Sequence, residues 1–255
     1  MSVLLAADCV SKSFTGRRVL AAGTLRAVPG EIRVVLGRNG VGKSTLIKIA
    51  AGWIQPDSGC VHYDGRAYLS VRLPALAAQG VFYLPDHDLL SSAFTVRAQL
   101  TMFSGRFRGD DPADAADRMD IAALIDRRPH TLSGGERRRA ELAAVFCRRP
   151  RCLLADEPYR GIAPRDAAAL TEAFRQLAAG GCAVVVTGHE VPTLLDAATH
   201  VTWCTAGTTY ELGAPEVARR HEEFRRGYLG PRAVSMTGSI SSTDASGTKN
   251  ADPSR

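Results

Sequence analysis

The stretch EIRVVLGRNGVGKSTLIKIAAGW (31–53) decides the fold of this chain. An apolar, β-branched run precedes the pattern G-x-x-x-x-G-K-[ST], and a helix-like apolar segment follows it. This order predicts a strand, a glycine-rich loop and a helix, which is the context in which the pattern binds phosphate groups. A glycine-rich turn that binds no ligand is the alternative interpretation.

Each residue type in this loop has an expected role. Glycines let backbone N–H groups turn inward toward phosphate oxygens, and the N-terminus of the following helix adds a positive potential. We expect Lys43 to reach the β- and γ-phosphates, the Ser44 hydroxyl to bind Mg²⁺, and Thr45 to help hold the α-phosphate. The candidate nucleotide-binding residues of the loop are Gly37, Arg38, Asn39, Gly40, Val41, Gly42, Lys43, Ser44 and Thr45.

Short β-like runs alternate with helical segments along the rest of the chain, which predicts an α/β fold with helices on the faces of a sheet. The predicted strands are 3–10, 18–28, 31–36, 59–63, 81–84, 151–155, 182–187, 199–205 and 208–212. The stretch 87–131 has helical patterns and no strand, so we expect a helical lobe inserted into one domain, 1–232. The tail 233–255 is rich in Ser, Thr, Gly and Asp, and we expect it to be disordered.

The composition describes a globular chain: 255 residues, 45% hydrophobic and 23% charged. Its apolar runs are far shorter than the roughly 20 residues of a membrane span, and its N-terminus lacks the basic region of a signal peptide. We therefore expect a cytoplasmic protein. The six cysteines form no Cys-x-x-Cys pair and are expected in the core. The net charge of +6 suits a polyanion, but excess arginine is ordinarily solvated surface, so no direct nucleic-acid partner is expected.

Two adjacent carboxylates follow the apolar run of LLADEPYRGIAPRD (153–166). An acid at the end of a strand beside a phosphate loop supports Mg²⁺, and Asp156 suits that position. Glu157 then faces the attacking water as a general base. An acidic helix cap is the alternative for Asp156 alone, but its occurrence with the phosphate loop argues against it.

The segment LSGGE (132–136) precedes an amphipathic helix that leads into the strand with the acids. A serine followed by two glycines at a helix start makes a second anion-binding turn. A chain that already has one phosphate loop needs a different nucleotide, or a different copy of itself, for this turn. Its candidate ligand-binding residues are Ser133, Gly134 and Gly135.

In the order and spacing of these motifs, residues 3–230 resemble the nucleotide-binding subunit of an ATP-binding cassette (ABC) protein. The resemblance implies a P-loop NTPase core with an antiparallel β subdomain and an inserted helical subdomain. It also implies that two cassettes, as a homodimer or a heterodimer, enclose two ATP molecules with Mg²⁺ between phosphate loop and signature. In VVVTGHE (184–190), His189 matches the switch histidine that touches the γ-phosphate, and Phe14 matches the aromatic that stacks on adenine. Without the resemblance, Phe14 reads as a core residue and His189 as a surface or core histidine.

Two positions depart from the family pattern. Asp86 in YLPDHD stands where the family has a glutamine that binds Mg²⁺ and water; an aspartate can hold a cation but cannot donate a hydrogen bond. Ala163 in GIA stands where the family has an aspartate that links the two ATP sites. We expect its loss to loosen communication between the sites and to leave Glu157 as the catalytic base.

The resemblance predicts the ATP-hydrolysing subunit of an ABC transporter, held at the inner face of the membrane by a separate permease. The segment LGAPEVARRHEEFRRGYLG (212–230) resembles cassettes of branched-chain amino-acid importers and of lipopolysaccharide export. The alternative is a soluble ABC ATPase that acts in assembly or on nucleic acid. A module that binds ATP without hydrolysing it is a third class, and the intact Glu157 and His189 argue against it.

Overall fold

A ten-stranded sheet organises the computed structural model, which describes residues 2–229 except 69 and 71. Its order is β5-β4-β1-β2-β10-β9-β3-β8-β7-β6. The predicted disordered tail 233–255 lies outside the described residues. The strands are β1 (Leu5–Phe14), β2 (Arg17–Ala27), β3 (Ile32–Leu36), β4 (Ser58–Tyr63), β5 (Arg66–Tyr68), β6 (Val81–Leu84), β7 (Cys152–Ala155), β8 (Ala183–Gly188), β9 (His200–Thr205) and β10 (Thr208–Gly213).

The sheet is mainly antiparallel toward β5 and parallel toward β6, and β10 joins β2 through a parallel pairing. Strands β1, β2, β4 and β5 pair antiparallel, and β9 with β10 forms an antiparallel pair between them and the parallel strands. Strands β9, β3, β8, β7 and β6 pair parallel in that order. The carboxyl ends of β3, β7 and β8 therefore meet at one edge, where ligands bind in open α/β sheets.

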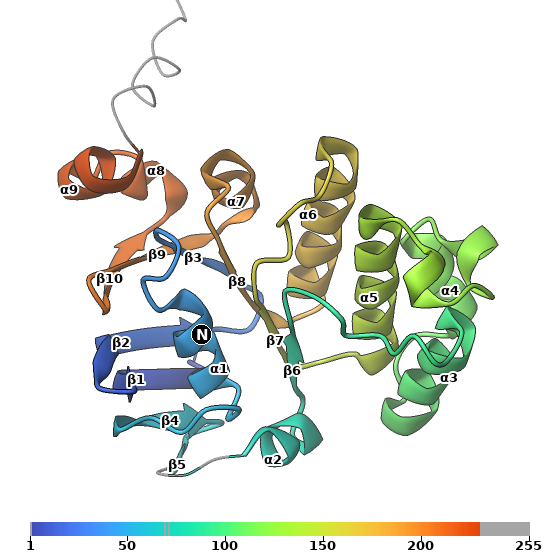
Figure 1. Ribbon diagram of the computed structural model, residues 1–255, viewed down its shortest axis with the longest axis horizontal. Helices are drawn as coiled ribbons and strands as arrows, with labels where there is room; N and C mark the ends of the chain where they lie inside the picture. The colour runs from blue at the N-terminus through green and yellow to red at the C-terminus, as the bar shows by residue number, and fades with distance from the viewer. Residues whose placement is uncertain (1, 69, 71, 230–255) are drawn as a thin grey trace, which may run out of the picture.

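The parallel strands are buried on both faces, which accounts for their continuous apolar sequences. In β3, Val34 and Leu36 belong to one apolar cluster, whereas Val35 belongs to the other. The second cluster fills the space around α1 (Lys43–Ala50), which packs against β1 and β2. Figure 1 shows α1 between the antiparallel strands and the parallel strands. The phosphate-loop helix is thus held on both sides by the sheet.

Most of the remaining helices form three groups along the molecule. Helices α3, α4 and α5 lie at one end of the molecule, α8 and α9 lie at the other, and α6 and α7 lie between them (Figure 1). Residues 85–151, all described, form no strand, so the helical insertion expected in the fold is present. The helices are α2 (Leu73–Ala78), α3 (Val96–Phe107), α4 (Pro112–Arg118), α5 (Gly134–Arg148), α6 (Pro164–Ala179), α7 (Val191–Ala197), α8 (Pro215–Ala218), α9 (Glu222–Phe224) and the short turns η1 (Ala122–Leu124), η2 (Pro129–Thr131) and η3 (Arg225–Leu229).

The predicted strands all coincide with observed ones, with two differences. Strand β1 continues to Phe14, beyond its predicted end at residue 10. A bulge at Cys9, whose φ is 48°, shifts the register and breaks the alternation by which the sequence would show this extension. The three-residue β5 has too little sequence to give a pattern. Four cysteines lie in the core, but Cys9 is exposed and Cys60 is half-buried, so the expectation of core cysteines is wrong for these two. In the described part of the chain, no helix has the length and apolar character of a membrane span.

Candidate functional site

The phosphate loop lies between β3 and α1, as its sequence predicts. Gly42 caps α1 with φ 110°, a conformation that side chains other than glycine rarely adopt. Gly37 approaches β9 so closely that a Cβ there would lie 2.4 Å from the carbonyl oxygen of Cys204. All three predicted glycines are therefore required by geometry: Gly40, with φ 77°, and Gly42 by their backbone angles, and Gly37 by its neighbour.

Lys43 is 3% exposed, and its ammonium group lies inside the loop. Its Nζ donates to the carbonyl oxygens of Gly37 at 2.8 Å and Arg38 at 3.2 Å. The same Nζ lies 3.5 Å from Oε1 of Glu157, at the end of β7. The loop cation and the second of the two adjacent acids thus face each other across the carboxyl edge of the sheet.

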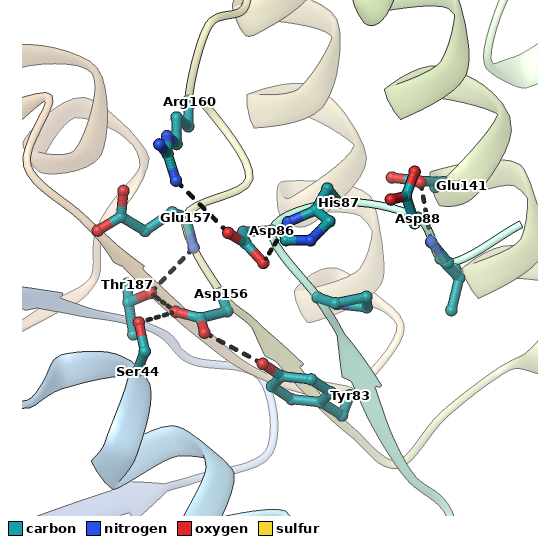
Figure 2. A network of polar contacts seen from close by, with 12 residues as sticks. Ser44, Tyr83, Asp86, His87, Asp88, Glu141, Asp156, Glu157, Arg160 and Thr187 are labelled. Carbon is teal, nitrogen blue, oxygen red and sulfur yellow. Dashed lines mark hydrogen bonds and ion pairs between the residues drawn. The ribbon is translucent and has the colours of Figure 1, made fainter. Parts of the chain in front are cut away.

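Asp156 is the centre of a buried polar network (Figure 2). Its Oδ1 accepts hydrogen bonds from the Ser44 hydroxyl at 2.9 Å and the Thr187 hydroxyl at 2.7 Å. Its Oδ2 accepts from the Tyr83 hydroxyl at 3.1 Å. Burial, with the adjacent Asp156 charge, raises the pKa of Tyr83, so this phenol stays a donor. The network joins α1 to β6, β7 and β8.

Glu157 is held by its backbone as well as its side chain. Its φ is 43°, and its N–H donates to the Thr187 hydroxyl at 2.9 Å. One carboxylate oxygen faces Lys43, and the other lies 3.3 Å from Nδ1 of His189. Nε2 of His189 lies 3.4 Å from Oε1 of Glu190. The two predicted catalytic residues, Glu157 and His189, are therefore in direct contact.

The oxygen atoms at Asp156 fit a magnesium ion. Mg²⁺ prefers octahedral oxygen ligands at about 2.0–2.1 Å, which places neighbouring ligands about 2.9 Å apart. Ser44 Oγ and Asp156 Oδ1 are separated by 2.9 Å, and a Thr187 hydroxyl steadies the carboxylate. One carboxylate and one hydroxyl are a typical set of protein ligands for a magnesium ion that also binds substrate phosphates.

The signature turn lies at the start of α5, on a different element from the phosphate loop. Ser133 is the helix cap: its hydroxyl accepts from the Glu136 N–H, and the Glu136 side chain accepts from the Ser133 N–H. Ser133 and Gly134 are exposed, whereas Gly135 is covered by Asp166 of α6. Asp166 also pairs with Arg139 at 3.3 Å. The exposed part of this turn faces away from its own core.

The structure does not bring every predicted residue into this cluster. Phe14 ends β1 and is 42% exposed, so the core interpretation is wrong; its adenine contact stays a prediction. The Asp86 carboxylate contacts His87 and Arg160, whereas Asp156 binds the hydroxyls described above. Asp86 as a metal ligand therefore stays a prediction, as do the roles of Asn39 and Thr45.

Sequence reasoning missed several residues of the site. Thr187 and Tyr83 bind Asp156, and the signal for Thr187 is a polar residue that ends the apolar run AVVV (183–186). The segment after α9 also reaches the phosphate loop. Arg38 donates to the carbonyl of Gly227 at 3.2 Å, and the Tyr228 hydroxyl lies 3.4 Å from the carbonyl oxygen of Gly37. No local pattern in the sequence announces these contacts.

Known proteins resemble this chain in sequence over most of its length. The ABC transporter family model matches residues 21–160. The lipopolysaccharide export ATP-binding protein LptB of Acidithiobacillus ferridurans is 31% identical over 236 residues, which cover 90% of this chain and 98% of that protein. The zinc import ATP-binding protein ZnuC of Yersinia enterocolitica is 35% identical over 227 residues, 88% of this chain and 84% of that one.

Solved structures share the fold. An ATP-binding cassette of an ABC transporter in its ADP conformation superposes with a TM-score of 0.75 at 20% identity, covering 92% of this chain and 98% of that one. CbiO1 from Clostridium perfringens, part of an ABC transporter complex, also gives 0.75, at 21% identity over 89% of this chain and 94% of that one. The predicted P-loop fold and the resemblance to lipopolysaccharide export cassettes are confirmed. The chain belongs to the ABC transporter family, as one of its ATP-binding, ATP-hydrolysing subunits.

Proposed function

We propose that this subunit hydrolyses Mg·ATP with Glu157 as general base, and that two cassettes close around the nucleotide to drive a separate membrane permease. The observation that carries the chemistry is the meeting of Lys43, Glu157 and the Asp156 network at one edge of the sheet. A cation, a base and a magnesium-type oxygen pair at the end of a phosphate loop are the parts that phosphoryl transfer to water requires.

The residues divide this work between them. The phosphate loop and Lys43 bind the triphosphate, and Ser44 and Asp156 would hold Mg²⁺. When bound, the ion neutralises charge on the phosphate oxygens. Glu157 accepts the proton of the attacking water. His189, whose Nδ1 lies 3.3 Å from the Glu157 carboxylate, orients that base and would contact the γ-phosphate.

The signature turn supports the two-cassette arrangement. Its exposed Ser133 and Gly134 begin α5, in the helical end of the molecule, whereas the phosphate loop begins α1 within the sheet (Figure 1). A second copy or a paralogous cassette would bring its signature to this chain's nucleotide. The relatives that serve lipopolysaccharide export and zinc import favour a transporter, and hence a permease partner at the cytoplasmic face of the membrane.

The base assignment is tested by Glu157→Gln in the purified protein. We expect this variant to bind ATP at least as tightly as the wild type in calorimetry and to lose turnover in a phosphate-release assay. Glu190→Gln is the matched control, because Glu190 also contacts His189 but does not face Lys43. Wild-type turnover in Glu157→Gln, or equal loss in both variants, would show that Glu157 is not the base.

The dimer is tested in the Glu157→Gln background by size exclusion with and without Mg·ATP. Gly135→Asp is a poor probe, because a Cβ there would lie 2.0 Å from a carboxylate oxygen of the chain's own Asp166. Gly134 has open space, so Gly134→Asp places a charge against the facing phosphate alone, and we expect ATP-induced dimers to disappear. Gly105→Asp, at an open position of α3, should dimerise normally. Dimers of Gly134→Asp would contradict the proposed arrangement.

A further inference from the structure

The loop that carries Asp86 is fastened to the signature helix by two buried charges. Arg138 and Glu141 of α5 have side chains 4% and 2% exposed, and they pair at 2.7 Å. Arg138 donates to the carbonyl oxygens of Pro85, at 2.9 Å, and Asp86. Glu141 accepts from the N–H of Leu89 at 3.2 Å. The backbone of residues 85–89 is therefore attached to α5.

The side chain of Asp86 points from that loop toward the turn that follows Glu157. Its Oδ2 lies 3.5 Å from Nη1 of Arg160, and its Oδ1 lies 2.8 Å from Nδ1 of His87 (Figure 2). The Arg160 N–H in turn donates to the carbonyl oxygen of Glu157 at 3.1 Å. A continuous series of contacts thus runs from α5, through Asp86 and Arg160, to the backbone of the catalytic base.

We propose that the Asp86–Arg160 ion pair is a positioning contact that sets the turn bearing Glu157. In this role Asp86 acts through Arg160 and is not a metal ligand. One carboxylate oxygen of Asp86 already faces the Arg160 guanidinium and the other faces the His87 imidazole, whereas Asp156 receives the Ser44 hydroxyl. The inference rests on the proposed function of Glu157 in ATP hydrolysis.

The contact has the character of an adjustable link. Arg160 is largely exposed, and exposed ion pairs contribute little and weaken in salt. The Arg138–Glu141 anchor is buried and firm, so the flexible step in the series is the Asp86–Arg160 pair. The alignment of Glu157 then depends on where α5 and its attached loop stand relative to the turn.

A double-mutant cycle of Asp86→Asn, Arg160→Gln and the double variant tests the proposal, with kcat, KM for ATP and the Mg²⁺ concentration for half-maximal rate measured for each. We expect each single variant to lower kcat about threefold, the scale of an exposed ion pair, and the double variant to be no worse than either. KM, the Mg²⁺ requirement and the melting temperature should stay at wild-type values. High salt should shrink the wild-type advantage.

The control is Asp88→Asn, because Asp88 lies in the same loop but pairs with Arg137 of α5 at 3.4 Å. We expect it to keep wild-type kcat. Additive losses, an unchanged kcat in either single variant, or a raised Mg²⁺ requirement in Asp86→Asn alone would each overturn the proposal. A wild-type protein without ATPase activity would instead contradict the proposed function. With an active wild type, the outcomes above overturn only the positioning role, so the two failures are distinguishable.

Discussion

The Lys43 ammonium and the Glu157 carboxylate lie 3.5 Å apart, and both side chains are largely buried. In this arrangement the loop cation neutralises the base and binds two loop carbonyls. We expect the negative charge of a bound triphosphate to draw Lys43 away from these partners. Nucleotide binding would then release Glu157, the proposed base, from its cation.

Replacing Lys43 should reveal this exchange. Lys43→Ala removes a charged donor to phosphate, and we expect ATP affinity to fall about 10- to 100-fold, corresponding to one charged hydrogen bond of about 1.5–3 kcal/mol. Lys43→Arg is the matched control: it keeps the charge but carries a planar fork that fits the loop less well, so an intermediate affinity is expected. Titration calorimetry measures both. Wild-type affinity in Lys43→Ala would contradict the role of this cation.

Gly37 is predicted to be the least tolerant glycine of the loop. A methyl group at this position would meet the Cys204 carbonyl oxygen at 2.4 Å and Val41 Cγ1 at 2.9 Å, and backbone cannot rotate away. We expect Gly37→Ala to lower the free energy of unfolding by about 1–3 kcal/mol and to weaken ATP binding. Gly105→Ala, in open space within α3, should instead raise stability by about 0.5–1 kcal/mol. Urea unfolding gives both values, and equal effects would contradict the steric argument.

Removing one member of the Arg138–Glu141 pair should lower the free energy of unfolding more than replacing both members with apolar residues. Burial lowers the pKa of Arg138 and raises the pKa of Glu141, because desolvation disfavours both charges. Arg138→Met leaves Glu141 without its cation, and we expect about 3–5 kcal/mol of lost stability. Arg138→Met with Glu141→Leu should lose less than the sum of the single changes. Additive losses in urea unfolding would show that the two side chains act independently.

Ala163 stands at the position of the family's aspartate and is also the N-cap of α6. Its φ and ψ are extended, and its side chain makes no capping hydrogen bond. A residue with a capping oxygen is worth about 1 kcal/mol there. We therefore expect Ala163→Ser and Ala163→Asp to raise the free energy of unfolding by similar amounts. Chemical denaturation checks this, and an unchanged stability in both would mean that the cap is satisfied in another way.

The same two variants separate helix capping from communication between sites. Ala163→Asp restores the family's charge at the expected seam, whereas Ala163→Ser supplies the cap alone. We expect only Ala163→Asp to change the dependence of turnover on ATP concentration. The effect should be at most that of one hydrogen bond to a charged group, about 1.5–3 kcal/mol, with about tenfold in rate for each 1.36 kcal/mol. Affinity of the monomer for nucleotide should stay unchanged. Identical rate curves for both variants would contradict a coupling role for this turn.

The sequence predicts the parallel strands of this fold well because burial on both faces requires a continuous apolar run. Runs such as VVV in β8 have no other place in a soluble α/β core. The phosphate loop and the acid pair are equally readable, since each depends on neighbours in the chain. The Asp86–Arg160 pair cannot be predicted from the sequence, because it joins two loops that are distant in the chain through side chains with many possible partners. Tyr83 and Thr187 were missed for the same reason.

The position of Asp156 has a consequence for how the protein is made. Its partner Ser44 lies 112 residues earlier in the chain, and Thr187 lies 31 residues later. During synthesis the phosphate loop leaves the ribosome long before β7 and β8 exist to complete the proposed metal-binding edge. Mg·ATP can then stabilise only the finished sheet, by about 2.7 kcal/mol at a hundred times its dissociation constant. The cell's own nucleotide would thus favour full-length chains over truncated ones.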